Sequence, residues 1–446
     1  GTGGDGSLGL KNVKEQGGVV FVQSPDEAEY RGMPESAIET GLVDVVATAA
    51  DLAVKLVNYR ESANRIHVAD PEIETNENDQ QTLTRIFALL QTQTGHDFSH
   101  YKRATILRRL QRRMQVNQIE SLKGYHTFLL KQSEEINALF KDFLISVTNF
   151  FRDSEAFEQL ETIVIPDIVS QKKKEDQIRV WVPGCATGEE AYSIAILFTE
   201  AIQRSGKKID LQIFASDLDE EALQAARRGL YAEAIATDIS PERLQRFFSK
   251  EVKGYRISRA IQENVLFAVH NLIKDAPFAR LDLVSCRNLL IYLKRDVQKK
   301  IFEIFHYALR PEGYLFLGGS ETADTVTDLF STVNKRHCVF QRCSVHTTLP
   351  TLPLSSPINQ LPSEIIERTK VSKPKMDELG LIHRDLMLNR YSPASVMVDA
   401  NYQIRYKFGE IGRYLIHNEG EPTHDILENV NRQLRTELRS ALYNVF

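Results

Sequence analysis

The feature that most constrains the fold is an alternation of short apolar, β-branched segments with helical segments after Phe157. These apolar segments are Ile178–Val182, Leu211–Ser216, Val265–Ala268, Leu281–Ser285 and Tyr314–Gly318. Strands buried on both faces read as continuous apolar runs, and the intervening helices supply the crossovers that parallel strands need. The sequence therefore predicts an α/β fold: a doubly wound, mostly parallel sheet with helices on both faces.

From Thr82 to Asn149 the apolar residues recur with the period of an α-helix. The predicted core positions are Phe87, Leu90, Ile106, Leu110, Phe128, Leu139, Phe143 and Leu144. We expect a helical bundle domain at 80–150, followed by the sheet domain at 151–343. The segment 239–262 interrupts the alternation and predicts a small β-subdomain.

Two polar stretches predict linkers, one at 59–79 and a Pro/Ser/Thr-rich one at 344–375. Residues 1–58 show the helix and strand pattern of part of another α/β unit, and 376–446 start a further patterned module. Since 446 residues exceed the usual size of one core, several domains are expected. Because the sequence starts at Gly1 without Met, we expect it to be a fragment.

Composition excludes several classes of protein. The net charge of −5 gives no reason to expect nucleic acid or membrane binding. The four cysteines lie far apart without a CxxC pair, so we expect neither a disulfide framework nor a metal site, and a cytoplasmic location. No apolar run approaches the length of a membrane span.

The segment Val180–Glu190 runs from an apolar strand into the turn Gly184-Cys185-Ala186-Thr187-Gly188 and then a helix. Glycines let a ligand approach the backbone closely, and the helix start presents free N–H groups. A nicotinamide dehydrogenase would need GxGxxG here, but the chain has GxxxG followed by Glu189 and Glu190, which would repel a pyrophosphate. A cationic or phosphate-free nucleotide is favoured.

Polar residues follow three other predicted strands, at Asp217, at Asn271-Leu272 and at Cys286-Arg287. In open α/β sheets, ligands bind at the carboxyl ends of the strands, and an acidic residue there accepts hydrogen bonds from ribose hydroxyls. Asp217 is equally well explained as the N-cap of the next helix. A helix cap is an alternative explanation for Arg287-Asn288, but the accumulation of turns on one edge of the sheet favours a ligand site.

One predicted helix carries a basic arc formed by Arg108, Arg109, Arg112 and Arg113, opposite an apolar side. Such arcs are usually solvated faces. Because this arc is almost entirely positive, docking of an acidic partner is a second hypothesis.

Four ordered motifs resemble the CheR-type chemotaxis receptor methyltransferases over about 80–343. They are Ser146-Val-Thr-Asn-Phe-Phe-Arg152, Pro183-Gly-Cys-Ala-Thr-Gly-Glu-Glu190, Phe214-Ala-Ser-Asp217 and Cys286-Arg-Asn-Leu-Leu-Ile-Tyr292. The resemblance implies a fold and an activity: a helical domain, a cofactor domain with a β-subdomain, and methyl transfer from S-adenosylmethionine to glutamate carboxylates of receptors. The basic arc would then dock the acidic methylation helices of the receptor.

The resemblance also implies roles for individual residues. Cofactor contacts are expected from Ser146, Thr148, Arg152, Glu189, Asp217, Asn271, Leu272, Cys286 and Arg287, with Asp217 on the ribose. Because a glutamate with a pKa of about 4.3 is ionised at neutral pH, the displacement needs no general base. We therefore expect Arg152 and Tyr292 to act by aligning the reactants.

The flanking parts resemble other signalling modules. Residues Gly1–Gly6 and Gly32-Met-Pro34 resemble the end of a CheB-type methylesterase domain, in which Asp5 would be the acid of a Ser/His/Asp triad. A triad acid alone cannot hydrolyse an ester, so no esterase activity is expected. Residues 386–446 resemble the PAS-like part of CheB–CheR–PAS fusions. The alternatives are a non-catalytic signalling scaffold and a same-fold methyltransferase with another acceptor.

Overall fold

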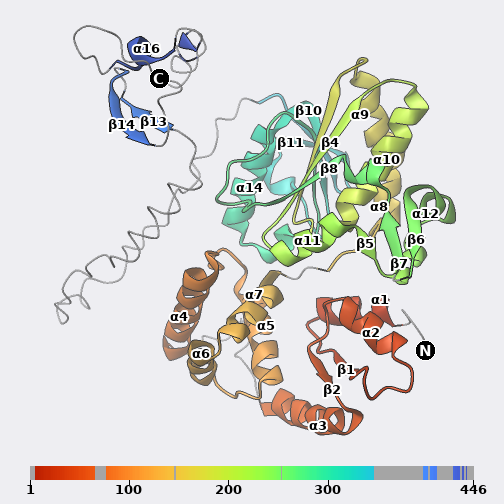
Figure 1. Ribbon diagram of the computed structural model, residues 1–446, viewed down its shortest axis with the longest axis vertical. Coiled ribbons are helices and arrows are strands. Elements are labelled where there is room, and N and C mark those ends of the chain that lie inside the picture. Colours follow the sequence, from red (N-terminus) through yellow and green to blue (C-terminus); the bar gives the residue numbers. More distant parts are fainter. Residues whose placement is uncertain are drawn as a thin grey trace. The chain divides into compact units, whose positions relative to one another are not determined.

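The computed structural model describes most of the chain as far as Val345 and short pieces beyond it. The described residues are 6–65, 77–144, 147–252, 254–345, 395–399, 402–408, 425–431, 434, 435 and 438. The chain forms two compact units, Gly1–Ser355 and Ser356–Phe446, which are treated separately below (Figure 1).

The centre of the first unit is a seven-stranded sheet with the order β11-β12-β10-β9-β3-β4-β8. Its strands are β3 (Gln177–Pro183), β4 (Asp210–Asp217), β8 (Val265–Val269), β9 (Leu281–Cys286), β10 (Leu309–Leu317), β11 (Phe330–Asn334) and β12 (Val339–Arg342). The five predicted strands pair in parallel, whereas β12 pairs antiparallel with both β10 and β11. The predicted doubly wound, mostly parallel sheet is confirmed.

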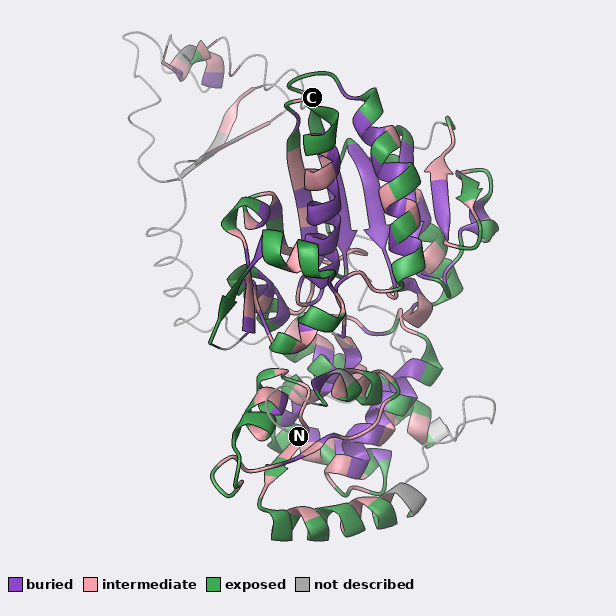
Figure 2. Cartoon of the chain, turned by 90° about the vertical axis from the view of Figure 1, so that its right-hand side faces the viewer, coloured by how far each residue is buried: buried purple, intermediate pink, exposed green. Residues whose placement is uncertain are grey.

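Helices cover both faces of this sheet, as the buried interior in Figure 2 shows. They are α8 (Ser154–Gln159), α9 (Ile165–Gln171), α10 (Glu189–Ser205), α11 (Glu220–Arg228) and α14 (Arg295–Ala308), with a π-helical turn at Leu160–Val164. Side chains alternate along the strands: Tyr314 and Phe316 pack in one core cluster with α9 and α10, and Leu315 packs in the other with α14. The chain leaves β3 for β4 and β8 on one side and returns to β9 on the other. This reversal creates the crevice where such sheets bind ligands.

A small antiparallel sheet, with the order β5-β7-β6, follows α11. Its elements are β5 (Leu230–Tyr231), β6 (Phe248–Glu251) and β7 (Gly254–Ile257), together with α12 (Pro241–Phe247), α13 (Arg259–Gln262) and a 3₁₀ turn at Glu233–Thr237. Gly254 has φ +136°, and a Cβ there would lie 2.0 Å from the Tyr231 carbonyl oxygen. The predicted subdomain exists, but its first strand precedes the expected boundary at 239.

The helical domain consists of α4 (Glu77–Thr94), α5 (Arg103–Val116), α6 (Leu122–Lys131) and α7 (Ser133–Leu144). Of the predicted core residues, Leu90, Ile106, Leu110, Leu139 and Phe143 are buried, and the others pack partly buried against them. The core prediction for this domain is confirmed.

The N-terminal segment contains α1 (Ser7–Glu15), β1 (Phe21–Gln23), α2 (Gly32–Glu39), β2 (Val45–Ala47) and α3 (Ala49–Arg65). β1 and β2 pair in parallel over a small core that includes Val20 and Val22. Because α3 continues to Arg65, the prediction of a linker from residue 59 is wrong over this helix.

In the second unit the described pieces are an antiparallel hairpin, β13 (Ser395–Val398) with β14 (Ile404–Phe408), and the short helix α16 (Ile426–Asn429). Residues 391–394 and 409–415, which carry much of the PAS resemblance, lie outside the described residues. The PAS-like domain stays a prediction. In the described part of the chain, no helix is long and apolar enough to cross a membrane.

Candidate active site

The turn after β3 brings bare backbone to the ligand edge of the sheet. Gly184, Ala186 and Gly188 all have positive φ, and a Cβ on Gly188 would lie 2.8 Å from the Ala226 Cβ. The Gly184 amide donates to the Ser216 carbonyl at 2.7 Å, which ties the turn to the end of β4. Only glycine suits position 188, both for its backbone conformation and for the lack of space.

A cavity opens beside this turn and encloses about 1040 Å³ of empty space, including open solvent. The sequence-predicted residues that line it are Thr148, Arg152, Asp217, Asn271, Leu272, Arg287 and Tyr292. The structure thus brings together residues that are separated by more than a hundred positions in the chain.

Asp217 ends β4 with its carboxylate held by backbone donors. The Ala186 amide donates to Oδ2 at 2.8 Å, and the Asp219 amide donates to Oδ1 at 2.9 Å. Burial raises the pKa of Asp217, and these hydrogen bonds only partly oppose that effect. The N-cap of α11 is Asp219, whose side chain accepts from the Ala222 amide, so the capping explanation for Asp217 is wrong.

Glu190, in the first turn of α10, joins the turn after β3 to the end of β9. Its Oε1 accepts from the Ser285 hydroxyl at 2.7 Å, and its Oε2 lies 3.6 Å from Arg287 Nη1. Burial raises the pKa of Glu190, opposed mainly by the charge of Arg287. Glu190 lines the cavity, so the two carboxylates Glu190 and Asp217 face a ligand there.

Arg287 is completely buried and stacks over the rings of Phe157 and Phe316, with its guanidinium carbon 5.2 and 4.8 Å from their centroids. Its Nη2 donates to Asp153 at 2.6 Å. Its Nε and Nη1 are buried without a hydrogen-bond acceptor in the described part of the chain. The charge of this buried guanidinium is balanced by Asp153 and by Glu190, whose Oε2 lies 3.6 Å from Nη1.

Glu321, which sequence reasoning missed, organises the loop that follows Arg287. Its carboxylate accepts from the amides of Gly318, Asn288 and Leu290, at 2.8, 3.0 and 2.7 Å. Asn288 has φ +57°, a conformation that costs energy for a residue other than glycine. The Glu321 carboxylate therefore holds a strained loop that carries both Arg287 and Tyr292.

Arg152 and Tyr292 lie on the side of the cavity nearer the helical domain. Arg152 is flanked by Phe151 and Asp153, which both have positive φ. Its Nη1 donates to the Val147 carbonyl at 3.2 Å. Burial raises the pKa of Tyr292, so its phenol is neutral at physiological pH.

Some predicted site residues are not in the cavity. Glu189 is buried beside it, where its Oε2 accepts from the Thr187 hydroxyl at 2.6 Å, and Glu190 takes the expected place. Cys286 is fully buried in the core between the sheet and α14. Neither Glu189 nor Cys286 is among the residues that line the cavity, and their contacts with a cofactor stay predictions. Ser146 and Asp5 lie outside the described residues.

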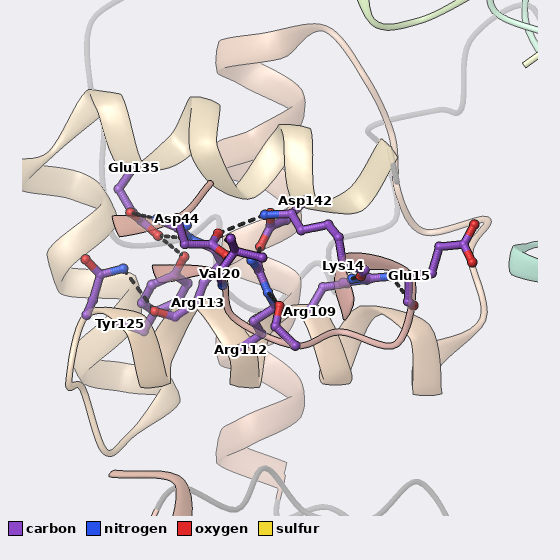
Figure 3. Close-up of polar contacts among 12 residues, drawn as sticks. Lys14, Glu15, Val20, Asp44, Arg109, Arg112, Arg113, Tyr125, Glu135 and Asp142 are labelled. Carbon is purple, nitrogen blue, oxygen red and sulfur yellow. Dashed lines mark hydrogen bonds and ion pairs between the residues drawn. The ribbon is translucent and has the colours of Figure 1, made fainter. Parts of the chain in front are cut away.

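The basic arc on α5 is largely buried. Arg109, Arg112 and Arg113 are 1%, 2% and 9% exposed, and only Arg108 among the four predicted residues faces solvent. Arg112 pairs with Asp44 of the N-terminal segment and with Asp142 of α7 (Figure 3). Arg113 Nε donates to Glu135 at 2.8 Å. Acids of this chain pair with Arg112 and Arg113, and backbone carbonyls at the end of α1 accept from Arg109. The prediction that these three arginines dock an acidic partner is therefore wrong for the described arrangement.

Other residues that sequence reasoning missed also line the cavity. Glu15 comes from α1, Tyr101 precedes α5, and His270 follows β8. His270 Nε2 lies 3.0 Å from the Ala276 carbonyl oxygen, while its Nδ1 is buried without a partner in the described residues. No local pattern identified these residues, because each reaches the cavity from a different element.

Three family models match consecutive parts of the chain. Residues 1–56 match the CheB methylesterase model, 81–144 the all-alpha domain of CheR methyltransferases, and 146–339 their S-adenosylmethionine-binding domain. These matches agree with the order of domains expected from the sequence.

Individual proteins are similar over different lengths. The Rhodobacter capsulatus "Uncharacterized 104.1 kDa protein in hypE 3'region" is 34% identical over 96% of this chain, but the chain spans only 46% of that protein. Chemotaxis protein methyltransferase 2 of Vibrio cholerae is 33% identical, over 53% of this chain and 84% of its own length. Chemotaxis protein methyltransferase Cher2 of Pseudomonas putida is 38% identical, over 42% of this chain and 69% of its own length. The chain therefore belongs to the CheR family of S-adenosylmethionine-dependent chemotaxis methyltransferases.

Proposed function

We propose that this protein transfers methyl groups from S-adenosylmethionine to glutamate side chains of chemotaxis receptors, forming methyl esters. The observation that carries the proposal is the meeting of Arg152, Asp217 and Tyr292 in one cavity at the crevice of the sheet. Names of relatives such as chemotaxis protein methyltransferase 2 of Vibrio cholerae support the choice of acceptor.

The side chains around the cavity fit this cofactor. Glu190 and Asp217 offer negative charge to a cationic nucleoside and disfavour a pyrophosphate. Asp217 would hold the ribose hydroxyls, since each carboxylate oxygen keeps a lone pair beyond its backbone hydrogen bond. Arg287, whose buried donors lack acceptors, would face the adenosine with Asn271 and Leu272.

When bound, S-adenosylmethionine supplies an electrophilic methyl group on a sulfonium. Arg152 would fix the carboxylate of its methionine part, with Thr148 beside it, and the neutral phenol of Tyr292 would border the acceptor glutamate. Because that glutamate is already ionised at neutral pH, no side chain has to remove a proton. The contribution of these residues is alignment, which can supply a very large effective molarity.

Two observations support a proposal for the cellular compartment: the nature of the acceptor and the state of the cysteines. Receptor methylation helices are cytoplasmic, and the cysteines Cys185, Cys286, Cys338 and Cys343 are all free, which supports a reducing compartment. We propose a cytoplasmic location for the site. A sensing role for residues 376–446 is part of the same proposal and rests on the PAS resemblance alone.

Transfer of radiolabelled methyl to membranes rich in chemoreceptors tests the proposal. Alkali should release the label as volatile methanol, because carboxyl methyl esters are base-labile. Arg152→Ala should lose most of the transfer, whereas Arg295→Ala, an exposed arginine of α14, should retain it. Base-stable label would indicate another acceptor, and cofactor binding without any transfer would favour the scaffold alternative.

A further inference from the structure

The N-terminal segment reaches the methyltransferase cavity through α1. Glu15 lines the cavity, and its Oε1 lies 3.0 Å from Arg152 Nη2. One turn earlier, Lys11 Nζ donates to the Thr148 carbonyl at 2.7 Å and to Asn149 Oδ1 at 3.2 Å. Residues that match the methylesterase model therefore form part of the wall of the methyltransferase site.

The position of Glu15 is fixed by the buried arginines of α5 (Figure 3). Arg109 donates to the carbonyls of Lys14 and Glu15 at 3.1 and 3.3 Å. Arg112 donates to the Gly18 carbonyl at 3.0 Å. Arginines at the last carbonyls of a helix satisfy groups that have no partner within the helix. The end of α1 is thus clamped with the Glu15 carboxylate facing Arg152.

This contact occupies the guanidinium that the proposed function assigns to the cofactor. One terminal nitrogen of Arg152 contacts Glu15 and the other donates to the Val147 carbonyl. A guanidinium binds a carboxylate best through two parallel N–H donors, so a second carboxylate has to displace Glu15 or accept a poorer geometry. Both side chains of the Arg152–Glu15 pair are 27% exposed, so a ligand has access to the pair.

We propose that Glu15 is an internal competitor for Arg152, through which the methylesterase-like segment restrains cofactor binding. The proposal rests on the proposed function, because it takes the competing group to be the carboxylate of the methionine part. Release of α1 from α5 would free Arg152 and expose the buried arginines to an acidic partner at the same time.

Binding of two ligands that differ in this carboxylate tests the proposal without any turnover. S-adenosylhomocysteine carries the amino-acid carboxylate, and 5′-methylthioadenosine has the same nucleoside without it. By titration calorimetry on the full chain, Glu15→Gln should tighten S-adenosylhomocysteine about threefold to fivefold, the range for loss of one partly exposed ion pair. It should leave methylthioadenosine unchanged.

Matched variants separate this effect from a general loss of charge. Glu35→Gln removes an exposed acid of the same segment, in the first turn of α2, and should change neither affinity. Lys11→Met removes the second contact of α1 with the site and should tighten S-adenosylhomocysteine in the same direction as Glu15→Gln. This second variant keeps the test decisive if Glu15→Gln folds poorly.

The outcomes distinguish this proposal from the proposed function. Unchanged or weaker S-adenosylhomocysteine binding by Glu15→Gln, in a chain that methylates receptors, would overturn the competition and leave the function standing. Tighter binding in a chain that methylates no receptor would support the competition and refute the acceptor. Equal tightening of S-adenosylhomocysteine and methylthioadenosine would also overturn the competition, because the effect of Glu15 would then not depend on the ligand carboxylate.

Discussion

Asp44→Asn should loosen the attachment of the N-terminal segment to α5. In the native chain Asp44 and Asp142 together neutralise Arg112 and Lys14, and the side chains of Asp44 and Arg112 are each 2% exposed. The Asn variant keeps the side-chain shape but leaves the buried Arg112 and the half-buried Lys14 facing one carboxylate. Removal of one partner from a buried ion pair costs about 3 kcal/mol or more, so the local opening equilibrium should rise roughly a hundredfold.

Amide hydrogen exchange of α1 and β1 measures this opening directly. A global unfolding curve is unsuitable, because a chain with several domains does not unfold in one step. Glu135→Gln is the matched control: it breaks the Arg113 pair inside the bundle and should speed exchange in α6 and α7, not in β1. A rise of less than about threefold in β1, under 0.7 kcal/mol, would refute the idea that these ion pairs hold the segment.

The same pairs predict a pH dependence with a defined sign. Burial alone would raise the pKa of Asp44, but the charges of Arg112 and Lys14 outweigh burial, so the pKa is lowered below its ordinary 3.8. A carboxyl with a lowered folded-state pKa stabilises the fold above the ordinary value, and this stability is lost as the pH falls through the folded pKa. The protection of β1 amides, measured relative to their intrinsic exchange rate at each pH, should therefore fall below about pH 4 in the native chain. Asp44→Asn should lack that acid phase.

Three further outcomes are expected. Gly188→Ala should lower the melting temperature of the methyltransferase domain more than Gly206→Ala: both positions have positive φ, but only at Gly188 does a Cβ meet another atom at 2.8 Å. Calorimetric scans of both variants measure the difference. Glu321→Gln should weaken S-adenosylhomocysteine binding about tenfold, because its carboxylate holds the strained loop through charge-assisted hydrogen bonds worth about 1.5–3 kcal/mol each. Unchanged affinity by titration would contradict this role. Burial raises the pKa of Asp217, so its carboxyl takes up a proton at a higher pH than an ordinary aspartate does. As the pH falls through that range, the folded chain without ligand gains stability. Binding of S-adenosylhomocysteine should weaken over the same range, because the carboxylate loses its charge. Titrations at stepped pH should show this loss in the native chain and a smaller one in Asp217→Asn.

The sheet and its ligand edge were predictable because their signals are local. A strand such as β9 is buried at every position and reads as an apolar run, and the residues after such strands necessarily meet at one edge. The edge strand β11 was missed because it carries a weak apolar pattern: only Phe330 is buried in it. The sequence also did not show which of the two adjacent carboxylates, Glu189 or Glu190, lines the cavity. Successive residues of a helix point about 100° apart, so the choice depends on where α10 begins.

The failure at α5 shows what periodicity leaves undecided. The pattern correctly separated the apolar side of the helix, with Ile106 and Leu110 in the core, from the arc of arginines. It did not show what covers that arc, because the acids that pair with Arg112 and Arg113 come from elsewhere: Asp44 lies just before β2, and Glu135 and Asp142 lie on α7. These acids have no fixed spacing from the arc. A basic helix face can therefore be buried once opposite charges from distant segments are available to pair with it. At α5 the consequence is functional as well as structural. An acidic partner reaches Arg112 and Arg113 only by replacing acids that already pair with them, and the segment that supplies Asp44 is the one that places Glu15 against Arg152.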